Sequence, residues 1–562
     1  MSGRWQLRWL CAVQTVLLAV AAWRNQHQLN PDAIAYCRIA GYYAGGQWDL
    51  AVSGYWGPLL SWLMVPLLKA GCPPLAAARA MMAVSGVVFL FGAVAVFRAF
   101  RLPRRAMVTG ATIAVGWSVF WSVRNISPDL LLAGLVGLAV SATVRLFLFR
   151  SRRGDEADSE RGIKRNRLLT SAATAGWWWG VAYLAKAVAL PLAVLVTVGL
   201  AGFAASGRAD LRRVLALRLG MVWLCLALVA GPWIGVLSSH YGKFTFSTTG
   251  PIAHALAGPG EASRYHPAMV TLHQPDEGRV TQWEEPSRMA YRFWSPFGSE
   301  ENFRHQLGVV WSNAGTVTSW LQGVRWISGA ETVRGVAGMV PGFDLLGLSL
   351  VAVAGGLAVG CFENRHLRRV RWCWAAWPVI GLGGLYLPFW FQAEDQRYFY
   401  AAFPFVWVLV LGGWRWTCAQ GWTWTRGIRL RLFRLAGVAF LIPAGMWLCA
   451  GIWSLPNAAS RTARELAAEL GSLQVSGPFA GSAAMPGGRT GLYTAFLLGE
   501  RWLGDDALAQ PAAFEAAGVR VAILRPSPQA DAFAADSGWR KLELRAGQGS
   551  VAVFTRASPM RK

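Results

Sequence analysis

The sequence predicts a polytopic α-helical membrane protein with about eleven transmembrane helices, an outer-face loop region and a small C-terminal α/β domain. Of its 562 residues, 54% are hydrophobic and only 15% are charged, whereas soluble globular proteins carry about 25% charged residues. Runs such as 128–149 and 187–206 reach the roughly 20 apolar residues that cross a ~30 Å hydrocarbon layer. This composition is that of an integral membrane protein.

The net charge of +25 does not indicate nucleic-acid binding, because the basic residues gather in short clusters between the hydrophobic runs. Such clusters mark the cytoplasmic side of a membrane. We therefore assign the charge to orientation and predict no nucleic-acid partner. The main clusters lie at 98–105, 145–167, 208–218, 365–371 and 415–434.

If these clusters all lie on the cytoplasmic side, one membrane topology is consistent with them. It has the N-terminus in the cytoplasm and the C-terminus outside. The apolar run 57–71 is short and contains Pro58 and Pro66, so we expect a helix along the outer surface there and not a span. The expected spans are 7–23, 78–98, 106–123, 128–149, 168–185, 187–206, 214–238, 343–361, 372–391, 399–416 and 435–455.

Three pieces are expected outside the membrane. Two belong to the transmembrane domain 1–455: an outer loop, 24–77, and an insertion, 239–342. The third is the tail 456–562, which we expect to form the soluble α/β domain. In the tail, "GVRVAILRP" and "GSVAVFTR" predict strands, while "RTARELAAELGSL" and "QPAAFEAAGV" predict helices.

Acidic residues are scarce in the membrane domain. The chain has 29 Asp and Glu residues, and most lie in the cytoplasmic loops, the insertion or the tail. A charge near the bilayer costs roughly 3 kcal/mol on insertion scales, and this cost favours a functional role. The remaining acids, all at outer helix ends or outer loops in the predicted topology, are Asp32, Asp49, Asp129, Asp344, Glu394 and Asp395.

A few basic residues are expected at the same outer level. Arg124 lies in "SVRNISPDLLL", Lys186 in "VAYLAKAVALP" and Arg397 in "FQAEDQRYFYAAFP". Segments that are distant in the sequence thus bring acids and bases to one depth. That convergence is the strongest functional signal in the sequence.

Each of these residues also has a structural explanation. Asp129 can complement the positive end of a helix, and Lys186 can extend toward the interface. The turn 394–397 can be solvated with local ion pairs, and Asp32 can cap a helix.

The order of these segments resembles the GT-C superfamily of membrane glycosyltransferases. The resemblance is closest to the branch that holds protein O-mannosyltransferases and the aminoarabinose transferases of lipid A. It covers most of 1–455. It rests on "NPDAIAYCRIAGYYAGGQWDL" followed by "GYWGPLLSWLMVPLL", on "RNISPDLLLAGLVGLA", on "GVAYLAKAVALPLA" and on "EDQRYFYAAFPF".

The resemblance implies a polyprenyl-phosphate-linked sugar as donor and an envelope glycan, lipid or protein as acceptor, at the outer face of a bacterial inner membrane. Asp32 would be the catalytic acid, and Lys186 and Arg397 would hold the donor phosphate. Candidate supporting residues are Arg124, Asp129, Glu394, Asp395, Tyr398, Tyr36 and Tyr42.

The chain departs from that branch in its first outer loop. The branch often has two adjacent acids, and here Ala33 follows Asp32. The Lys-Pro-Pro-Leu-like element of the branch is replaced by Trp56-Gly57-Pro58-Leu59. No cofactor is indicated, and the missing acid leaves open both a divalent metal and the acceptor type.

The proposed residues suit the chemistry. Sugar transfer to a hydroxyl needs a base for the hydroxyl proton and cations where charge builds on the departing phosphate. Asp32 can be that base in an inverting reaction, while Lys186 supplies a point charge and Arg397 a bidentate fork.

Three alternatives remain. A transporter would usually show a midplane site at an internal repeat, and none is visible. A non-catalytic envelope assembly protein would not need charges at the membrane edge. A metal enzyme would use the insertion histidines, but no HExxH spacing occurs, so we expect surface residues; they are His240, His254, His266, His273 and His305.

Two of the eight cysteines, Cys37 and Cys72, are expected outside the membrane. A disulfide between them is compatible with that location, although the sequence alone does not pair them.

Overall fold

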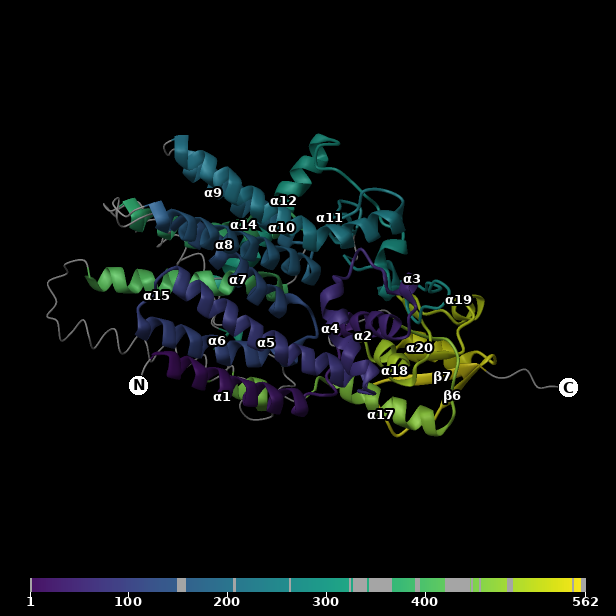
Figure 1. The fold of residues 1–562 in the computed structure, drawn as a ribbon. Coiled ribbons are helices and arrows are strands. Elements are labelled where there is room, and N and C mark those ends of the chain that lie inside the picture. Colours follow the sequence, from purple (N-terminus) through teal and green to yellow (C-terminus); the bar gives the residue numbers. More distant parts are fainter. Residues whose placement is uncertain are drawn as a thin grey trace.

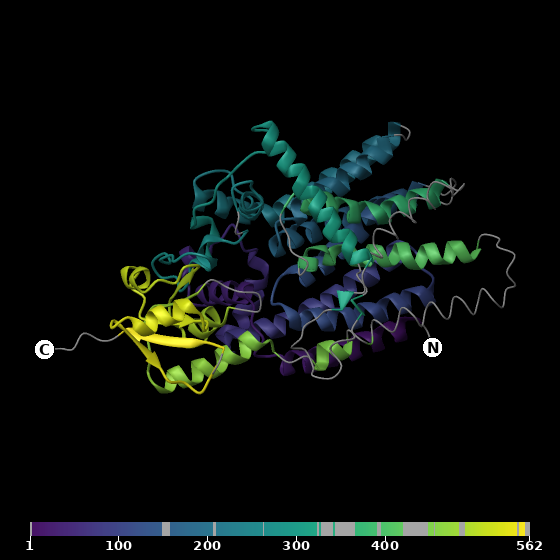
Figure 2. The same ribbon diagram turned by 180° about the vertical axis from the view of Figure 1, so that it is seen from behind.

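The computed structural model is mostly helical, with a small sheet near the C-terminus. Figures 1 and 2 show a bundle of long helices with the sheet and its helices packed at one end of it. The described residues are 3–148, 158–205, 209–261, 264–322, 325–326, 341–342, 366–389, 395–419, 445, 448–453, 456–482, 489–547 and 550–556.

The bundle is built from long helices at the expected spans. Expected span 343–361 lies outside the described residues, and of 435–455 only 445 and 448–453 are described, so the total of eleven stays a prediction. The bundle helices are α1 (Gly3–Arg24), α5 (Pro74–Ala99), α6 (Arg104–Arg124), α7 (Asp129–Leu148), α8 (Asp158–Ala185), α9 (Ala189–Ala205), α10 (Ala209–Tyr241), α14 (His366–Tyr386) and α15 (Phe403–Ala419).

Within the described residues, five helices are long and apolar enough to cross a membrane. These are Trp5–Arg24, Pro74–Ala99, Arg104–Arg124, Asp129–Leu146 and Leu215–Tyr241. With the hydrophobic composition, they support an integral membrane protein.

Helices α5 and α7 approach closely because both carry glycine at the contact. A Cβ atom added to Gly92 would collide with the carbonyl oxygen of Gly134. Small residues allow such backbone contact between helices in a membrane. The contact fixes α7, whose first residue is Asp129.

The outer loop 24–77 forms three short helices, α2 (Pro31–Ala44), α3 (Trp48–Ala51) and α4 (Pro58–Lys69). Helix α4 is the short helix predicted from 57–71. The N-cap of α2 is Asn30, with Pro31 and Asp32 in the first turn, where proline and a negative charge are both favourable. The interpretation of Asp32 as the cap residue was therefore wrong.

Asn30 ties the start of α2 to the turn before α7. Its side-chain oxygen accepts from the Ile126 N–H at 2.9 Å, and its amide nitrogen donates to the Ile126 carbonyl at 3.2 Å. One side chain thus satisfies both backbone groups of a buried residue. Asp32 and Asp129 are held in the same neighbourhood by this contact.

The insertion has little regular structure beside two helices, α11 (Thr249–Leu256) and α12 (Glu300–Gln322). Three short 3₁₀ turns lie between them, and a two-residue strand pair, β1 with β2, follows. Their bounds are η1 (Pro267–Met269), η2 (Gln282–Glu284), η3 (Pro286–Arg288), β1 (Arg325–Trp326) and β2 (Pro341–Gly342).

The tail forms the predicted α/β structure around a five-stranded sheet in the order β4-β3-β5-β7-β6. Strand β3 pairs in parallel with β4 and β5, and β7 pairs antiparallel with β5 and β6. The elements are α17 (Ala458–Ser472), β3 (Phe479–Ser482), α18 (Thr490–Leu498), β4 (Trp502–Asp506), α19 (Pro511–Ala516), β5 (Val521–Leu524), α20 (Pro528–Ala535), β6 (Trp539–Leu542) and β7 (Ala552–Arg556).

The two predicted strands and two predicted helices of the tail are confirmed as β5, β7, α17 and α19. Strands β3, β4 and β6 and helices α18 and α20 were not predicted. Phe514, Phe533 and Phe554 are buried together in the core of this sheet.

The tail is bonded to the segment just before Asp32. The Leu29 N–H donates to the Ser460 hydroxyl at 2.9 Å, and the Asn457 N–H donates to the Gln28 side chain at 2.6 Å. Helix α18 also packs against α2. The sheet domain therefore helps to position the start of α2.

Candidate functional site

The first pair of charges joins α2 to a 3₁₀ segment, η5 (Asp395–Ala402). A guanidinium nitrogen of Arg397 donates to Oδ2 of Asp32 at 2.5 Å, and their side chains are 19% and 15% exposed. The two residues are 365 positions apart in the chain. The structure thus brings together the predicted catalytic acid and one predicted phosphate ligand.

The second pair joins α7 to the turn between α8 and α9. Nζ of Lys186 lies 2.5 Å from Oδ1 of Asp129, with the lysine side chain 21% exposed and the carboxylate 3% exposed. Asp129 stands at the N-terminus of α7, so it complements the helix dipole as well as the lysine. The structural explanation of Asp129 is therefore confirmed, and its functional role stays a prediction.

Tyr398 lies between the two cations. Nζ of Lys186 is 4.4 Å from the centre of its ring, and the guanidinium carbon of Arg397 is 5.4 Å away. Tyr386 stacks on Tyr398 with ring centres 5.1 Å apart and an angle of 15°. Cations over an aromatic face are attracted by the ring quadrupole, so Tyr398 links the two pairs into one cluster.

Tyr36 also belongs to this cluster. Burial raises the pKa of its hydroxyl well above the usual value, the charges of Asp32 and Asp129 raise it further, and Arg397 lowers it. A group that senses both carboxylates lies near both. Tyr36 is 3% exposed and packs edge-on against Trp56 at 5.2 Å.

The other predicted supporting residues are placed differently. Arg124 ends α6 with its guanidinium 5.0 Å from the Phe120 ring, and among the described contacts no hydrogen bond joins it to either ion pair. Asp395 begins η5, and nothing is described of its side chain. Glu394 lies outside the described residues.

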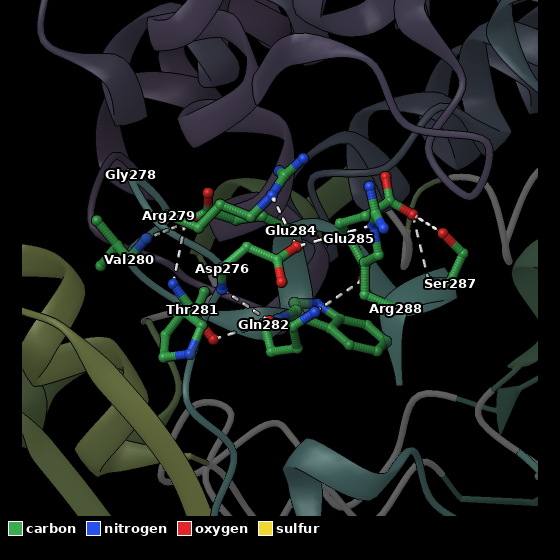
Figure 3. A network of polar contacts seen from close by, with 12 residues as sticks. Asp276, Gly278, Arg279, Val280, Thr281, Gln282, Glu284, Glu285, Ser287 and Arg288 are labelled. Carbon is green, nitrogen blue, oxygen red and sulfur yellow. Dashed lines mark hydrogen bonds and ion pairs between the residues drawn. The ribbon is translucent and has the colours of Figure 1, made fainter. Parts of the chain in front are cut away.

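Tyr42 contacts Glu284, which belongs to a separate polar network of the insertion that Figure 3 shows. The Tyr42 hydroxyl donates to Oε2 of Glu284 at 2.6 Å, and Nε of Arg38 lies 3.6 Å from the other carboxylate oxygen. Glu284 is fully buried and accepts from the backbone N–H groups of Val280 and Thr281. Tyr42 therefore fastens α2 to the insertion, ten positions along the helix from Asp32.

A hydrogen-bonded chain of aromatic residues beside the cluster was missed. His266 contacts the Tyr55 hydroxyl through Nε2 at 3.2 Å and the Tyr291 hydroxyl through Nδ1 at 2.7 Å. The pKa of Tyr55 is raised by burial and then by Tyr398 and Asp32, so this series of hydrogen bonds ends near Asp32. Tyr55 was present in the quoted motif, but its partners come from the insertion.

His266 corrects the expectation that the insertion histidines are surface residues. Burial, followed by the charge of Arg489, lowers its pKa to about 3. The imidazole is therefore neutral near pH 7 and donates one hydrogen bond while accepting another. His254 and His305 are hydrogen-bonded as well, to Gln306 and to the Ala257 carbonyl.

A tyrosine of the tail domain lies within electrostatic range of Asp32. The pKa of Tyr493, on α18, is raised by burial, lowered by Arg489 and raised again by Asp32. Arg489 itself pairs with Asp505 at 2.8 Å. No signal in the sequence connected these residues to the membrane domain.

The disulfide considered between Cys37 and Cys72 is not formed. Both are free thiols, and Cys37 contacts the Pro74 carbonyl at 3.6 Å.

Among the described residues, no group of three Asp, Glu, His or Cys side chains is arranged to hold a metal ion. Asp32 and Asp129 each face a cation instead.

No protein-family model and no curated protein matches the sequence. Solved structures do match. ArnT from Cupriavidus metallidurans bound to undecaprenyl phosphate superimposes with a TM-score of 0.54 over 99% of both chains, at 14% identity. The oligosaccharyltransferase AglB from Archaeoglobus fulgidus with a dolichol-phosphate gives 0.50 over 91% of this chain and 69% of that one, at 12% identity.

The apo form of the Archaeoglobus fulgidus oligosaccharyltransferase gives a TM-score of 0.52 over 91% of this chain and 69% of that chain, at 12% identity. Likeness at this identity concerns the fold. These proteins are GT-C glycosyltransferases, and the expectation drawn from the sequence motifs is confirmed at that level: this chain has the GT-C fold.

Proposed function

We propose that the protein is a glycosyltransferase that moves a sugar from a polyprenyl-phosphate donor to an envelope glycan, lipid or protein at the outer face of a bacterial inner membrane. The observation that carries the proposal is the cluster in which Asp32–Arg397 and Asp129–Lys186 flank Tyr398. The fold supports it, because ArnT and AglB, which share the fold, were solved with polyprenyl phosphates.

The donor phosphate would exchange partners with the carboxylates. Arg397 and Lys186 each hold one acid in the present structure, and both cations suit a phosphate, Arg397 as a fork and Lys186 as a point charge. A phosphate that recruits Arg397 releases an oxygen of Asp32. Donor binding would therefore free the base that the acceptor needs.

The released carboxylate would act as general base. As the acceptor oxygen bonds to the anomeric carbon, Asp32 takes the hydroxyl proton and the bond from that carbon to the phosphate oxygen breaks. The leaving polyprenyl phosphate gains negative charge, which Arg397 and Lys186 stabilise. One displacement by one base gives inversion at the anomeric carbon.

Asp129 has a different role in this scheme. At 3% exposure it is too enclosed to serve a hydroxyl acceptor, and it holds the lysine in place. Tyr398 contacts both cations through its ring. The polyprenyl chain can lie along the apolar helices, which explains why the charges stand at one end of the bundle.

The proposal is tested by deleting the gene for this protein and analysing the polyprenyl-linked sugars and envelope glycans of the deletion strain by mass spectrometry. We expect one lipid-linked sugar to accumulate and the same sugar to disappear from one envelope component. Complementation with the wild type should restore the sugar, and Asp32→Asn should not. A deletion strain with unchanged lipid-linked sugars and unchanged glycans would contradict the proposal.

A further inference from the structure

A second concave site lies at the far end of α2 from Asp32. It is a cavity of about 560 Å³ between the C-terminal end of α2, the start of α3 and α4, which lie together beside the tail domain in Figure 1. Tyr43, in its wall, is eleven residues from Asp32 on the same helix, or about 16 Å at 1.5 Å per residue. The cavity is therefore distinct from the ion-pair cluster.

Three aromatic rings line this cavity. The ring of Tyr43 stands edge-on to Trp48 at 5.7 Å and to Trp62 at 6.1 Å. Trp48 is 65% exposed, although a large aromatic residue gains most when it is covered. Flat rings set at steep angles offer faces to a ligand with an apolar side, such as the C–H face of a pyranose.

The polar groups of the cavity add a charge preference. Lys69, in the last turn of α4, is the one charged residue among those lining the cavity, and it is exposed. Burial raises the pKa of the Tyr43 hydroxyl to about 12, and a hydrogen bond with the Trp62 side chain lowers it. Because this hydroxyl is buried against Trp62, Lys69 is the group that gives the cavity its charge preference.

We propose that this cavity, lined by Tyr43, Trp48, Trp62 and Lys69, binds an anionic sugar residue of the acceptor. The proposal rests on the proposed function and adds the acceptor class. Since one sugar ring cannot occupy the cavity and also reach Asp32, the acceptor is an oligosaccharide or a glycolipid with several sugar residues. Aromatic stacking holds the ring, and Lys69 selects a carboxylated or phosphorylated one.

Binding can be measured without any transfer reaction. Saturation-transfer NMR on the full chain in lipid nanodiscs would use glucuronic acid as the anionic probe and glucose as the neutral one. We expect glucuronic acid to bind more tightly, and Trp48→Ala to weaken both by about tenfold or more, as expected when stacking and apolar contact are lost. Lys69→Gln should reduce glucuronic acid binding to the level of glucose.

Two control variants locate the signal. Trp311→Ala removes another exposed tryptophan, 81% exposed and outside the cavity, and should leave binding unchanged. Asp32→Asn alters the pair Asp32–Arg397 while the fold is retained, and it should also leave glucuronic acid binding unchanged. Glucuronic acid binding that survives Trp48→Ala, or that changes with Asp32→Asn, would overturn the proposal.

Transfer assays separate this proposal from the proposed function. In membranes supplied with labelled donor, Trp48→Ala should transfer less label to the acceptor than the wild type. A glycolipid acceptor would be recovered in the organic extract, and a free oligosaccharide in the aqueous phase. Trp48→Ala should leave the slow hydrolysis of the donor unchanged, whereas Asp32→Asn should remove transfer. Equal transfer by Trp48→Ala and wild type would refute the acceptor site. If the wild type binds the probe, Trp48→Ala loses that binding, and the wild type shows no transfer, only the glycosyltransferase function would be refuted.

Discussion

The guanidinium of Arg397 holds the carboxylate of Asp32 at 2.5 Å, and the two residues belong to opposite ends of the membrane domain's sequence. The pair is partly exposed, so a ligand that enters the cluster can reach both members. A phosphate that competes for Arg397 would change the state of Asp32 directly. In the proposed mechanism, binding of the donor and activation of the acceptor would thus be coupled through one hydrogen bond.

Asp32→Asn should abolish transfer, because an amide cannot take the hydroxyl proton, while the fold is retained. We expect a loss of about 10² to 10⁴ in kcat, the usual contribution of a general base. The measurement is transfer from labelled lipid donor in proteoliposomes, with thermal unfolding as a check on folding. Asp49→Asn, which changes an exposed acid in the same outer loop, is the matched control and should transfer normally; an active Asp32→Asn protein would remove Asp32 from the mechanism.

Lys186→Met should destabilise the protein as well as inactivate it. The change leaves the nearly buried carboxylate of Asp129 without its cation, and such a loss costs about 3 kcal/mol or somewhat less at this partial exposure. Adding Asp129→Leu should restore the unfolding temperature and leave the Michaelis constant for the donor raised. If the double variant transfers at the wild-type rate, Lys186 has only a structural role.

Ser460→Ala should slow transfer from a distance. The Ser460 hydroxyl accepts from the Leu29 N–H, and both residues are buried, so the change leaves that N–H unsatisfied at a cost of about 1–3 kcal/mol. Leu29 stands three residues before Asp32, and we expect a lower kcat together with a lower unfolding temperature. Ser472→Ala removes an exposed hydroxyl from the same helix and is the control; equal behaviour of the two variants would contradict the role of the tail in positioning α2.

His266 should make stability depend on pH below neutrality. Its pKa is lowered to about 3 in the folded protein, against about 6.5 when unfolded. The unfolded chain therefore binds the extra proton between those values, and stability is lost as the pH falls from 6.5 toward 3, by at most about 1.4 kcal/mol per pH unit. Unfolding temperatures are measured for the wild type and His266→Gln from pH 4.5 to 7.5. The unfolding temperature should change less steeply with pH in the variant than in the wild type.

Tyr291→Phe provides the comparison for that experiment. It removes the hydroxyl that contacts Nδ1 of His266 and removes no group that titrates in this pH range. We expect a lower stability with the slope preserved. If the unfolding temperature falls equally steeply with pH in the wild type and in His266→Gln, a group other than His266 governs the loss of stability at low pH.

The sequence predicted the membrane class and the helix positions because both follow from local composition. Hydrophobic runs of sufficient length and basic clusters between them are properties of neighbouring residues. The same holds for β5 and β7, whose apolar runs are visible within a few residues. Strands β3, β4 and β6 are of similar length, but their sequences FAGS, WLGDD and WRKL carry glycine or charged residues and gave no comparable pattern. Scarce acids at outer helix ends also pointed to Asp32 and Asp129, which the structure pairs with Arg397 and Lys186; their roles in the reaction stay predictions.

By itself, then, the amino-acid order determined the membrane class and predicted that scarce ionised groups would gather at one level, since burying a charge in lipid is costly and the predicted topology assigns each helix end a side. Only the tertiary structure decided the partners: Arg397 for Asp32, Lys186 for Asp129, and Tyr42 drawn away to Glu284. Pairing depends on how helices pack and where the insertion and tail dock. Those contacts join residues hundreds of positions apart, and no local pattern encodes them.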